Sequence, residues 1–362
     1  MVKLVNSLFK LSNKILSVFP PLFTLTRLWF GFFMGTAFLL PTLILRFGFK
    51  RMLLSSNPKR SRTKTKYDSD PDCSSEFEES GFVTSDGVVI HFVSKGNPNG
   101  EVILFLHGFP ECWYSWKHQI DFFSEEGYRV VAMSLRGYAE SGKPKGKENY
   151  EISKLVHDVQ ELIEFLNVNQ VILVAHDWGG IIAFALTAAH PHLIKKLVIL
   201  NAPHSEIFLK LQVENLRQFW SSWYIYFFQF PFLPEIAVKM GDFAFLELCF
   251  APLLKSGKMS KSELDLFKYY ASQEGSLTGM INYYRNLTSK KAKTELKRFS
   301  KKIEVPTLVI WGEKDMGLVV ENLKGLNKFV DDLQVTRLPG ISHWVQQDDP
   351  ETVNREIFSF IC

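Results

Sequence analysis

One ten-residue stretch, residues 171–180, constrains the fold of this chain more than any other. It reads VILVAHDWGG, so a run of aliphatic residues ends at a carboxylate, Asp177, and a helix-like segment follows at once. Small residues stand two positions before and two positions after Asp177, as a sharp strand-to-helix turn requires. At the apex of such a turn, a carboxylate is predicted to act as a nucleophile that displaces a group at carbon. The alternative is that Asp177 only caps the helix.

Strands and helices alternate around this stretch. The predicted strands are a hairpin at 81–84 and 88–94, followed by 101–106, 128–133, 171–175, 196–200, 307–310 and 333–338. Helices are predicted at 114–126, 152–166, 181–190 and 351–361. This alternation predicts an α/β fold in which helices cover both faces of a mostly parallel sheet.

The alternation stops at residues 204–300, which are rich in aromatic residues and contain no convincing strand. Helical segments are predicted there at 219–228, 240–254, 261–271 and 278–287, so we interpret this part as an inserted helical cap. The expected organisation is an N-terminal segment (1–49), a polar linker (50–80), the first part of the core (81–203), the cap (204–300) and the second part of the core (301–362).

Residues 28–45 form an uncharged apolar run of 18 residues. A bilayer core of about 30 Å needs about 17–25 apolar residues, so the run predicts one transmembrane helix that anchors the chain. A cleavable signal peptide is the alternative, although its apolar region would be shorter and nearer the N-terminus. The run contains Gly31 and Gly35, a spacing found where membrane helices pair, and we base no prediction of a dimer on it.

The charge of the chain is unevenly distributed. Residues 1–66 carry 12 Lys and Arg and no Asp or Glu, which leaves 30 basic and 38 acidic residues in the remainder. More positive charge follows the apolar run than precedes it, so the catalytic domain is expected in the cytosol, on a single-pass protein of the endoplasmic reticulum membrane. The opposite topology is the alternative. The acidic folded part gives no reason to expect nucleic acid as a partner.

Four cysteines lie far apart in the sequence, without metal-binding spacing: Cys73, Cys112, Cys249 and Cys362. This distribution favours reduced thiols over a disulfide framework.

Three polar residues follow predicted strands, where the functional groups of a parallel sheet gather. They are Asp177, Asp315 and His343, in the order nucleophile, acid and histidine. Asp315 alone could be a turn residue, and His343 alone an ordinary loop histidine, but their joint placement favours a catalytic set. The strand after the one ending at Asp177 is followed by Asn201, which leaves Asp315 as the acid candidate.

From about residue 81 onward the chain resembles an epoxide hydrolase of the α/β-hydrolase superfamily. The motifs that carry the resemblance are HGFPE (107–111), RGYAES (136–141), HDWGG (176–180), GEKD (312–315) and GISHW (340–344). The layout with an N-terminal anchor resembles that of the animal epoxide hydrolases 3 and 4. The resemblance implies an α/β-hydrolase fold and a reaction that needs neither a metal nor a cofactor.

Dehalogenases with the same kind of nucleophile are an alternative, and the cap separates the two classes. An epoxide oxygen leaves as an alkoxide and needs a proton donor, whereas a halide leaves without one. The resemblance implies two cap tyrosines in this role: Tyr284, in NYYRN, matches the second, and Tyr224 resembles the first, with Tyr226 as a competitor. The other interpretation is that they are core aromatics of the cap.

The expected reaction runs through a covalent ester. Asp177 attacks an epoxide carbon while Tyr224 and Tyr284 hydrogen-bond the ring oxygen, and His343, oriented by Asp315, then activates water.

The backbone N–H groups of Phe109 and Trp178 are expected to form the oxyanion hole, in a loop tightened by Pro110, with a cis bond before it. Three further histidines are expected to hold loops: His107, His176 and His204.

The expected substrates are lipophilic epoxides, in particular epoxides of unsaturated fatty acids, which would give vicinal diols. A dehalogenase and a catalytically silent lipid-binding protein remain the alternative functions. The expected partners are therefore the epoxide, water and, through the anchor, a lipid bilayer, and no oligomeric state is predicted.

Overall fold

The computed structural model describes residues 2–17, 20–47, 77–287 and 289–362. The predicted linker, 50–80, lies outside the described residues except for its last four. Three of the cysteines, Cys112, Cys249 and Cys362, are described and are free thiols, whereas Cys73 lies outside the described residues.

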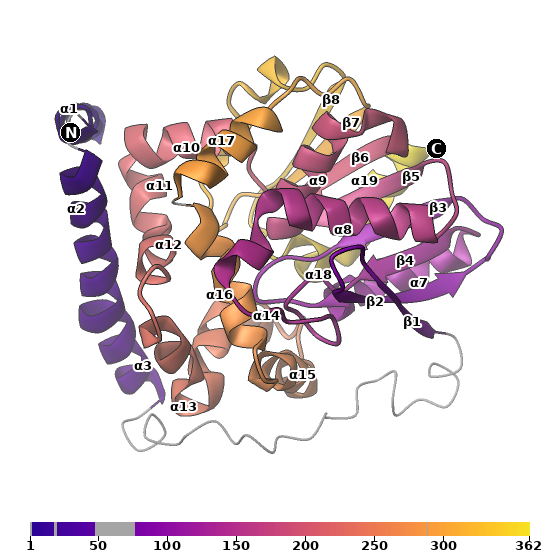
Figure 1. Cartoon of the computed structure of the whole chain (residues 1–362), viewed down its shortest axis with the longest axis horizontal. Coiled ribbons are helices and arrows are strands. Elements are labelled where there is room, and N and C mark those ends of the chain that lie inside the picture. Colours follow the sequence, from indigo (N-terminus) through magenta and orange to yellow (C-terminus); the bar gives the residue numbers. More distant parts are fainter. Residues whose placement is uncertain (1, 18–19, 48–76, 288) are drawn as a thin grey trace.

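One eight-stranded sheet forms the core of the molecule (Figure 1). Its strand order is β1-β2-β4-β3-β5-β6-β7-β8, with antiparallel pairing at β1–β2 and β2–β4 and parallel pairing at all other positions. The strands are β1 (Glu78–Val83), β2 (Val89–Gly96), β3 (Val102–Leu106), β4 (Arg129–Met133), β5 (Val171–His176), β6 (Ile194–Leu200), β7 (Thr307–Gly312) and β8 (Leu333–Leu338). Every residue of β3, β5 and β7 is buried, as expected of strands covered on both faces. The prediction of a mostly parallel sheet is confirmed.

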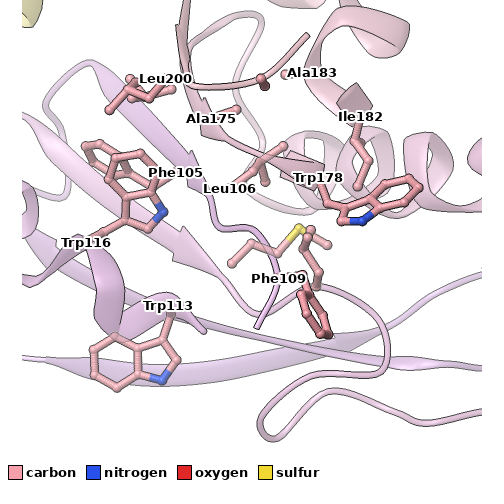
Figure 2. Packing of buried hydrophobic residues seen from close by; sticks show 14 of the residues in the cluster. Phe105, Leu106, Phe109, Trp113, Trp116, Ala175, Trp178, Ile182, Ala183 and Leu200 are labelled. Atoms are coloured by element: carbon pink, nitrogen blue, oxygen red, sulfur yellow. The ribbon is translucent and has the colours of Figure 1, made fainter. Parts of the chain in front are cut away.

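Helices cover the sheet in two pairs: α8 packs against α9, and α7 packs against α19. Figure 1 shows α8 in front of the sheet. The bounds are α7 (Lys117–Glu125), α8 (Ile152–Phe165), α9 (Trp178–Ala189), α18 (Val345–Asp348) and α19 (Pro350–Ile361), with short 3₁₀ turns η2 (Trp113–Trp116), η3 (Lys147–Tyr150), η4 (Pro191–Leu193), η5 (Val320–Leu323) and η6 (Leu326–Lys328). Their apolar faces close the core, where Phe105 of β3 packs on Trp116 with ring centroids 4.9 Å apart (Figure 2).

The described residues between β6 and β7 form the helical cap. Its helices are α10 (Ser205–Glu214), α11 (Leu216–Ser221), α12 (Trp223–Phe227), α13 (Leu233–Cys249), α14 (Ala251–Ser256), α15 (Lys261–Ser272), α16 (Ser276–Leu287) and α17 (Lys290–Arg298). The single helix predicted at 240–254 is wrong. The backbone is non-helical at 240–243, where Gly241 has a φ of 63°, and a new helix starts after Phe250 with Pro252 in its first turn.

The N-terminal part forms α1 (Val2–Ser17), α2 (Pro20–Phe33), the π-helix η1 (Met34–Leu39) and α3 (Leu40–Phe47). The last three follow one another without a break and include residues 24–46. Among the described residues, this is the helix long and apolar enough to cross a membrane, which is consistent with the predicted anchor. Figure 1 shows α2 and α3 lying along the side of the cap that faces away from the sheet.

Candidate active site

The turn between β5 and α9 places Asp177 at the carboxyl edge of the sheet. Its backbone has a φ of 49° and a ψ of −118°, a strained conformation for a residue with a side chain. The turn closes tightly: a Cβ on Gly179 would lie 2.4 Å from the carbonyl oxygen of Leu106, and one on Gly180 would lie 2.3 Å from the Cβ of Ala202. The side chain of Asp177 makes no capping hydrogen bond to α9, which argues against the interpretation as a helix cap.

His343 lies between the two carboxylates that the sequence singled out. Its Nε2 is 3.7 Å from Oδ2 of Asp177, and its Nδ1 is 2.6 Å from Oδ2 of Asp315. Asp315 is itself held from three sides, because its carboxylate accepts hydrogen bonds from the N–H groups of Gly317 (2.7 Å) and Leu318 (2.8 Å) and from the Asn201 amide (2.7 Å). Asn201 therefore helps to hold the carboxylate of Asp315 in place.

The pKa values of His343 and Asp315 are set by burial and by the neighbouring charges. Burial lowers the pKa of His343, but the carboxylates of Asp315, Asp177 and, more remotely, Glu111 outweigh burial and raise it to about 9. For Asp315, burial raises the pKa, while the charge and hydrogen bond of His343 and the hydrogen bond from Asn201 bring it below the usual value. At neutral pH the resting site thus holds an imidazolium between two carboxylates.

The loop after β3 approaches Asp177 from the opposite side. The N–H of Phe109 donates to Oδ1 of Asp177 at 2.9 Å, and a Cβ on Gly108 would lie only 2.4 Å from the Cβ of Asp177. The Phe109–Pro110 peptide bond is cis, as expected. Trp178 is the other residue whose N–H group is predicted to line the oxyanion hole. It is the first residue of α9, and the first N–H groups of a helix have no partner within that helix. Figure 2 shows Phe109 and Trp178 close to each other at this edge of the core.

Two cap tyrosines line the same cavity as Asp177. The rings of Tyr224 and Tyr284 lie 5.6 Å apart, and the ring of Tyr284 also contacts Phe109 and Trp178, each at 5.2 Å. Burial, and next the charge of Asp177, raise the pKa of both tyrosines well above the usual value, so both keep their protons.

Tyr226, the competitor of Tyr224, points elsewhere. Its hydroxyl donates to Oε1 of Gln212 at 2.9 Å and accepts from the guanidinium of Arg27, so it faces the N-terminal helix. Of the two candidates, Tyr224 is therefore the one that lines the cavity above Asp177.

Arg285, next to Tyr284, joins the two tyrosine-bearing segments. Its guanidinium donates to the carbonyl oxygens of Phe228 (3.1 Å) and Phe230 (2.8 Å), just after α12, and forms an ion pair with Glu235 at 2.8 Å. Sequence reasoning used the Tyr-Arg-Asn pattern only to locate a tyrosine and missed this structural role of the arginine.

A buried pair behind the site was also missed. Nδ1 of His176 lies 2.7 Å from Oε2 of Glu111, and Nε2 of the same ring lies 2.9 Å from the carbonyl oxygen of His343. The ring of His176 thus connects Glu111 to the backbone of His343. The position of Glu111 in the HGFPE motif was the available signal.

The other two histidines that were expected to hold loops, His107 and His204, are buried. His107 accepts a hydrogen bond from the N–H of Leu135 at 3.1 Å, and the ring of His204 stacks on Phe329 at 4.1 Å. Burial lowers the pKa of each to about 4, so both are neutral at physiological pH.

A cavity of about 460 Å³ opens above Asp177, with mostly apolar walls. Two basic residues also line it: Arg46, from the end of α3, and Lys255 of α14. The remaining lining residues are Phe109, Pro110, Asp177, Ser221, Trp223, Tyr224, Phe245, Leu248, Cys249, Ala251, Pro252, Tyr284, Met316, Gly317, Leu318, His343 and Trp344.

Comparisons with known proteins show the family of the chain. The alpha/beta hydrolase fold family matches residues 101–350. Epoxide hydrolase 3 of Xenopus tropicalis is 38% identical over 287 residues, which are 76% of this chain and 75% of that protein. Epoxide hydrolase 4 of Homo sapiens is 36% identical over 285 residues, 77% of each chain.

Solved structures are similar as well. The crystal structure of Bacillus megaterium epoxide hydrolase in complex with an inhibitor has a TM-score of 0.71 and 33% identity, covering 78% of this chain and 99% of that chain. The epoxide hydrolase VrEH1 of Vigna radiata has a TM-score of 0.70 and 32% identity, covering 79% of this chain and 98% of that chain.

Proposed function

The chain belongs to the epoxide hydrolases of the α/β-hydrolase family, and we propose that it opens epoxides through a covalent ester on Asp177. The observation that carries this proposal is the position of Asp177, with His343 Nε2 3.7 Å from one carboxylate oxygen and the N–H of Phe109 2.9 Å from the other. One oxygen is thus held in place by a backbone donor, while Oδ2 is left to attack.

In the first step, a bond forms between Oδ2 of Asp177 and an epoxide carbon, and the bond from that carbon to the ring oxygen breaks. Tyr224 and Tyr284 hydrogen-bond the ring oxygen, and one of them supplies its proton. Burial and the Asp177 charge keep these hydroxyls protonated until the oxygen develops negative charge.

In the second step, His343 first passes its resting proton to the tyrosinate left by ring opening, and the neutral ring then takes a proton from water. The hydroxide attacks the ester carbonyl, and the N–H groups of Phe109 and Trp178 stabilise the oxyanion. One oxygen of Asp177 leaves with the vicinal diol and is replaced by the oxygen of water. Of the two hydrogens of water, one returns His343 to its resting protonation and the other ends on the released alcohol. Formation of the ester has removed one of the charges that raise the pKa of His343, which makes the histidine a better base at this point.

A single turnover in ¹⁸O-labelled water tests the ester directly. With the enzyme in excess over styrene oxide, we expect the label in the peptide that contains Asp177, and the first diol to be unlabelled. Label in the diol and none in the peptide would refute the covalent route, because water would then have attacked the epoxide itself. His343→Gln should accumulate a peptide heavier by the mass of the epoxide.

We further propose that the substrates are lipophilic epoxides that carry a carboxylate, such as epoxides of unsaturated fatty acids. The mostly apolar walls of the cavity suit an acyl chain, and Arg46 and Lys255 supply positive charge for its carboxylate. Lys255→Ala should raise the KM for an epoxy fatty acid and leave the KM for its methyl ester unchanged. An equal effect on both substrates would refute a role in carboxylate binding.

The apolar helix at residues 24–46 supports attachment to a membrane. We propose that the enzyme is attached through this helix and that its catalytic domain faces the cytosol. The single pass and the endoplasmic reticulum stay predictions from the sequence.

A further inference from the structure

One face of the apolar N-terminal helix is occupied by the cap. Every fourth residue from 27 to 43 is buried or half-buried: Arg27, Gly31, Gly35, Leu39 and Leu43. In a straight α-helix, residues four apart drift by about 40° per step, and the wider turn of the π-helix η1 offsets this drift and keeps the row on one face.

The two glycines allow this helix to lie directly on α12. A Cβ on Gly31 would lie 2.5 Å from the backbone nitrogen of Phe227, and one on Gly35 would lie 2.3 Å from the Phe227 ring. Small residues four apart let two helices approach closely, and here the partner is a cap helix of the same chain.

Hydrogen bonds also join the N-terminal helix to the cap. The guanidinium of Arg27 donates to the hydroxyl of Tyr226 and to the carbonyl oxygen of Gln212, the latter at 2.9 Å. A charged residue in an apolar helix is costly in lipid and needs a partner. Arg27 finds its partners in the cap.

The segment before the apolar helix contacts the same cap. In α1, Asn13 donates to the carbonyl oxygen of Val213 at 2.9 Å, and Lys10 pairs with Glu214 at 3.4 Å. At the other end of the helix, Arg46 lines the catalytic cavity. Both flanks of the candidate membrane span therefore rest on one domain, whereas a crossing would separate them by the thickness of the bilayer.

The free face of the helix carries large apolar side chains. Trp29 is 63% exposed, and other large apolar side chains of the helix are exposed as well: Leu22, Leu25, Phe33, Phe38 and Leu45. The cap continues this surface with Trp220, whose ring contacts Phe30 at 4.9 Å, and with Phe232, which is 77% exposed, and Ile236. An apolar surface of this kind, on a basic N-terminal segment, suits the interface of a bilayer with anionic lipids.

We propose that the enzyme binds one leaflet of a bilayer through a surface shared by the docked N-terminal helix and the cap, without the single pass across the membrane that the sequence predicts. The surface consists of the free face of the helix together with Trp220, Phe232 and Ile236. A crossing would either break the contacts of Arg27, Gly31 and Gly35 or draw the neighbouring Glu235–Arg285 pair into hydrocarbon. This inference rests on the proposed membrane attachment, and it places the cap, with Tyr224, next to the lipid.

The side of the membrane on which α1 lies tests the proposal. In sealed microsomes, single cysteines are introduced in the full-length enzyme at exposed positions, Ser12→Cys in α1 and Lys145→Cys in the core, after Cys73, Cys249 and Cys362 are replaced by serine and the buried Cys112 by alanine. A membrane-impermeant maleimide should label both positions alike, either both without detergent or both only with detergent. Labelling of one position without detergent and of the other only with detergent would overturn the proposal. An enzyme that does not float with the membranes would refute the attachment itself.

The depth of the cap provides a second, independent measurement. A fluorescent label at Phe232→Cys is compared with the same label at Phe165→Cys, an exposed phenylalanine of the core. On vesicles of phosphatidylcholine and phosphatidylserine with brominated acyl chains, we expect strong quenching at position 232 and little at position 165. Quenching as weak at position 232 as at position 165 would mean that the cap does not touch the lipid, even if the enzyme binds the vesicles.

Discussion

Removing the charge of Asp177 should lower the pKa of His343. Asp177→Asn keeps the shape of the side chain and removes a negative charge 3.7 Å from Nε2 of the histidine. At this separation two unit charges interact by about 1 kcal/mol in water and about 4 kcal/mol at an effective dielectric constant of about 20. Since one pKa unit corresponds to about 1.4 kcal/mol, the pKa should fall by about 1–3 units from its value of about 9.

The measurement is an NMR titration of the histidine ring in labelled protein, with the signal assigned by its loss in His343→Gln. Glu125→Gln, a change of an exposed charge on α7, serves as the control and should leave the pKa of His343 unchanged. An unchanged pKa in Asp177→Asn would refute the claim that the nucleophile controls the protonation of its partner. An equal fall in both variants would point to the overall charge of the protein instead.

Three further predictions concern individual side chains. Tyr284→Phe and Tyr224→Phe should each slow ester formation by about 10²-fold or more, as loss of a general acid does, without slowing ester hydrolysis in single-turnover experiments; Tyr226→Phe is the matched control, and an equal loss in the control would contradict the assignment. Gly179→Ala should destabilise the fold by about 1–3 kcal/mol in urea unfolding, because its Cβ would lie 2.4 Å from the Leu106 carbonyl oxygen, whereas Gly317→Ala, with its nearest neighbour at 3.5 Å, should cost little. Asn201→Ala should lower the free energy of unfolding by about 1–3 kcal/mol, because it removes a hydrogen bond to a buried carboxylate, and it should raise the pKa of Asp315. An unchanged free energy of unfolding would contradict this role of Asn201.

The meeting of Asp177, Asp315 and His343 could be predicted from the sequence, because the topology of a parallel sheet largely determines where these residues lie. Asp177, Asp315 and His343 each follow a strand, and the carboxyl ends of such strands share one edge. The small residues around Asp177 also identified the sharp turn, because steric exclusion acts over a few positions. These inferences need only local patterns and the order of the strands.

Contacts between distant segments could not be predicted in the same way. Arg285 reaches Glu235 across 50 positions, and His176 reaches Glu111 across 65. A charged residue near a motif does not reveal its partner when many opposite charges are available. The pairing follows from the packing of the cap, and the kink at 240–243, which apolar periodicity did not reveal, is part of that packing.

The N-terminal helix shows a further limit of hydropathy. An apolar run predicts an apolar environment, but a lipid chain and the apolar side of a cap helix satisfy the same pattern. Gly31 and Gly35 were the available signal, since small residues four apart indicate a close helix contact. Without the position of Phe227, that signal could not tell a second copy of the helix from the cap.

One carboxylate controls both proton transfers of the proposed reaction. While Asp177 is charged, it helps to raise the pKa of Tyr224 and Tyr284 and that of His343, so the tyrosines keep their protons and the histidine is an imidazolium. Formation of the ester removes this charge and lowers all three pKa values together. As the ester forms, one tyrosine therefore gives its proton more readily to the opening ring oxygen. His343 then passes its proton to that tyrosinate and, once neutral, can accept one from water. The charge of Asp177 therefore couples both proton transfers to the formation of the ester.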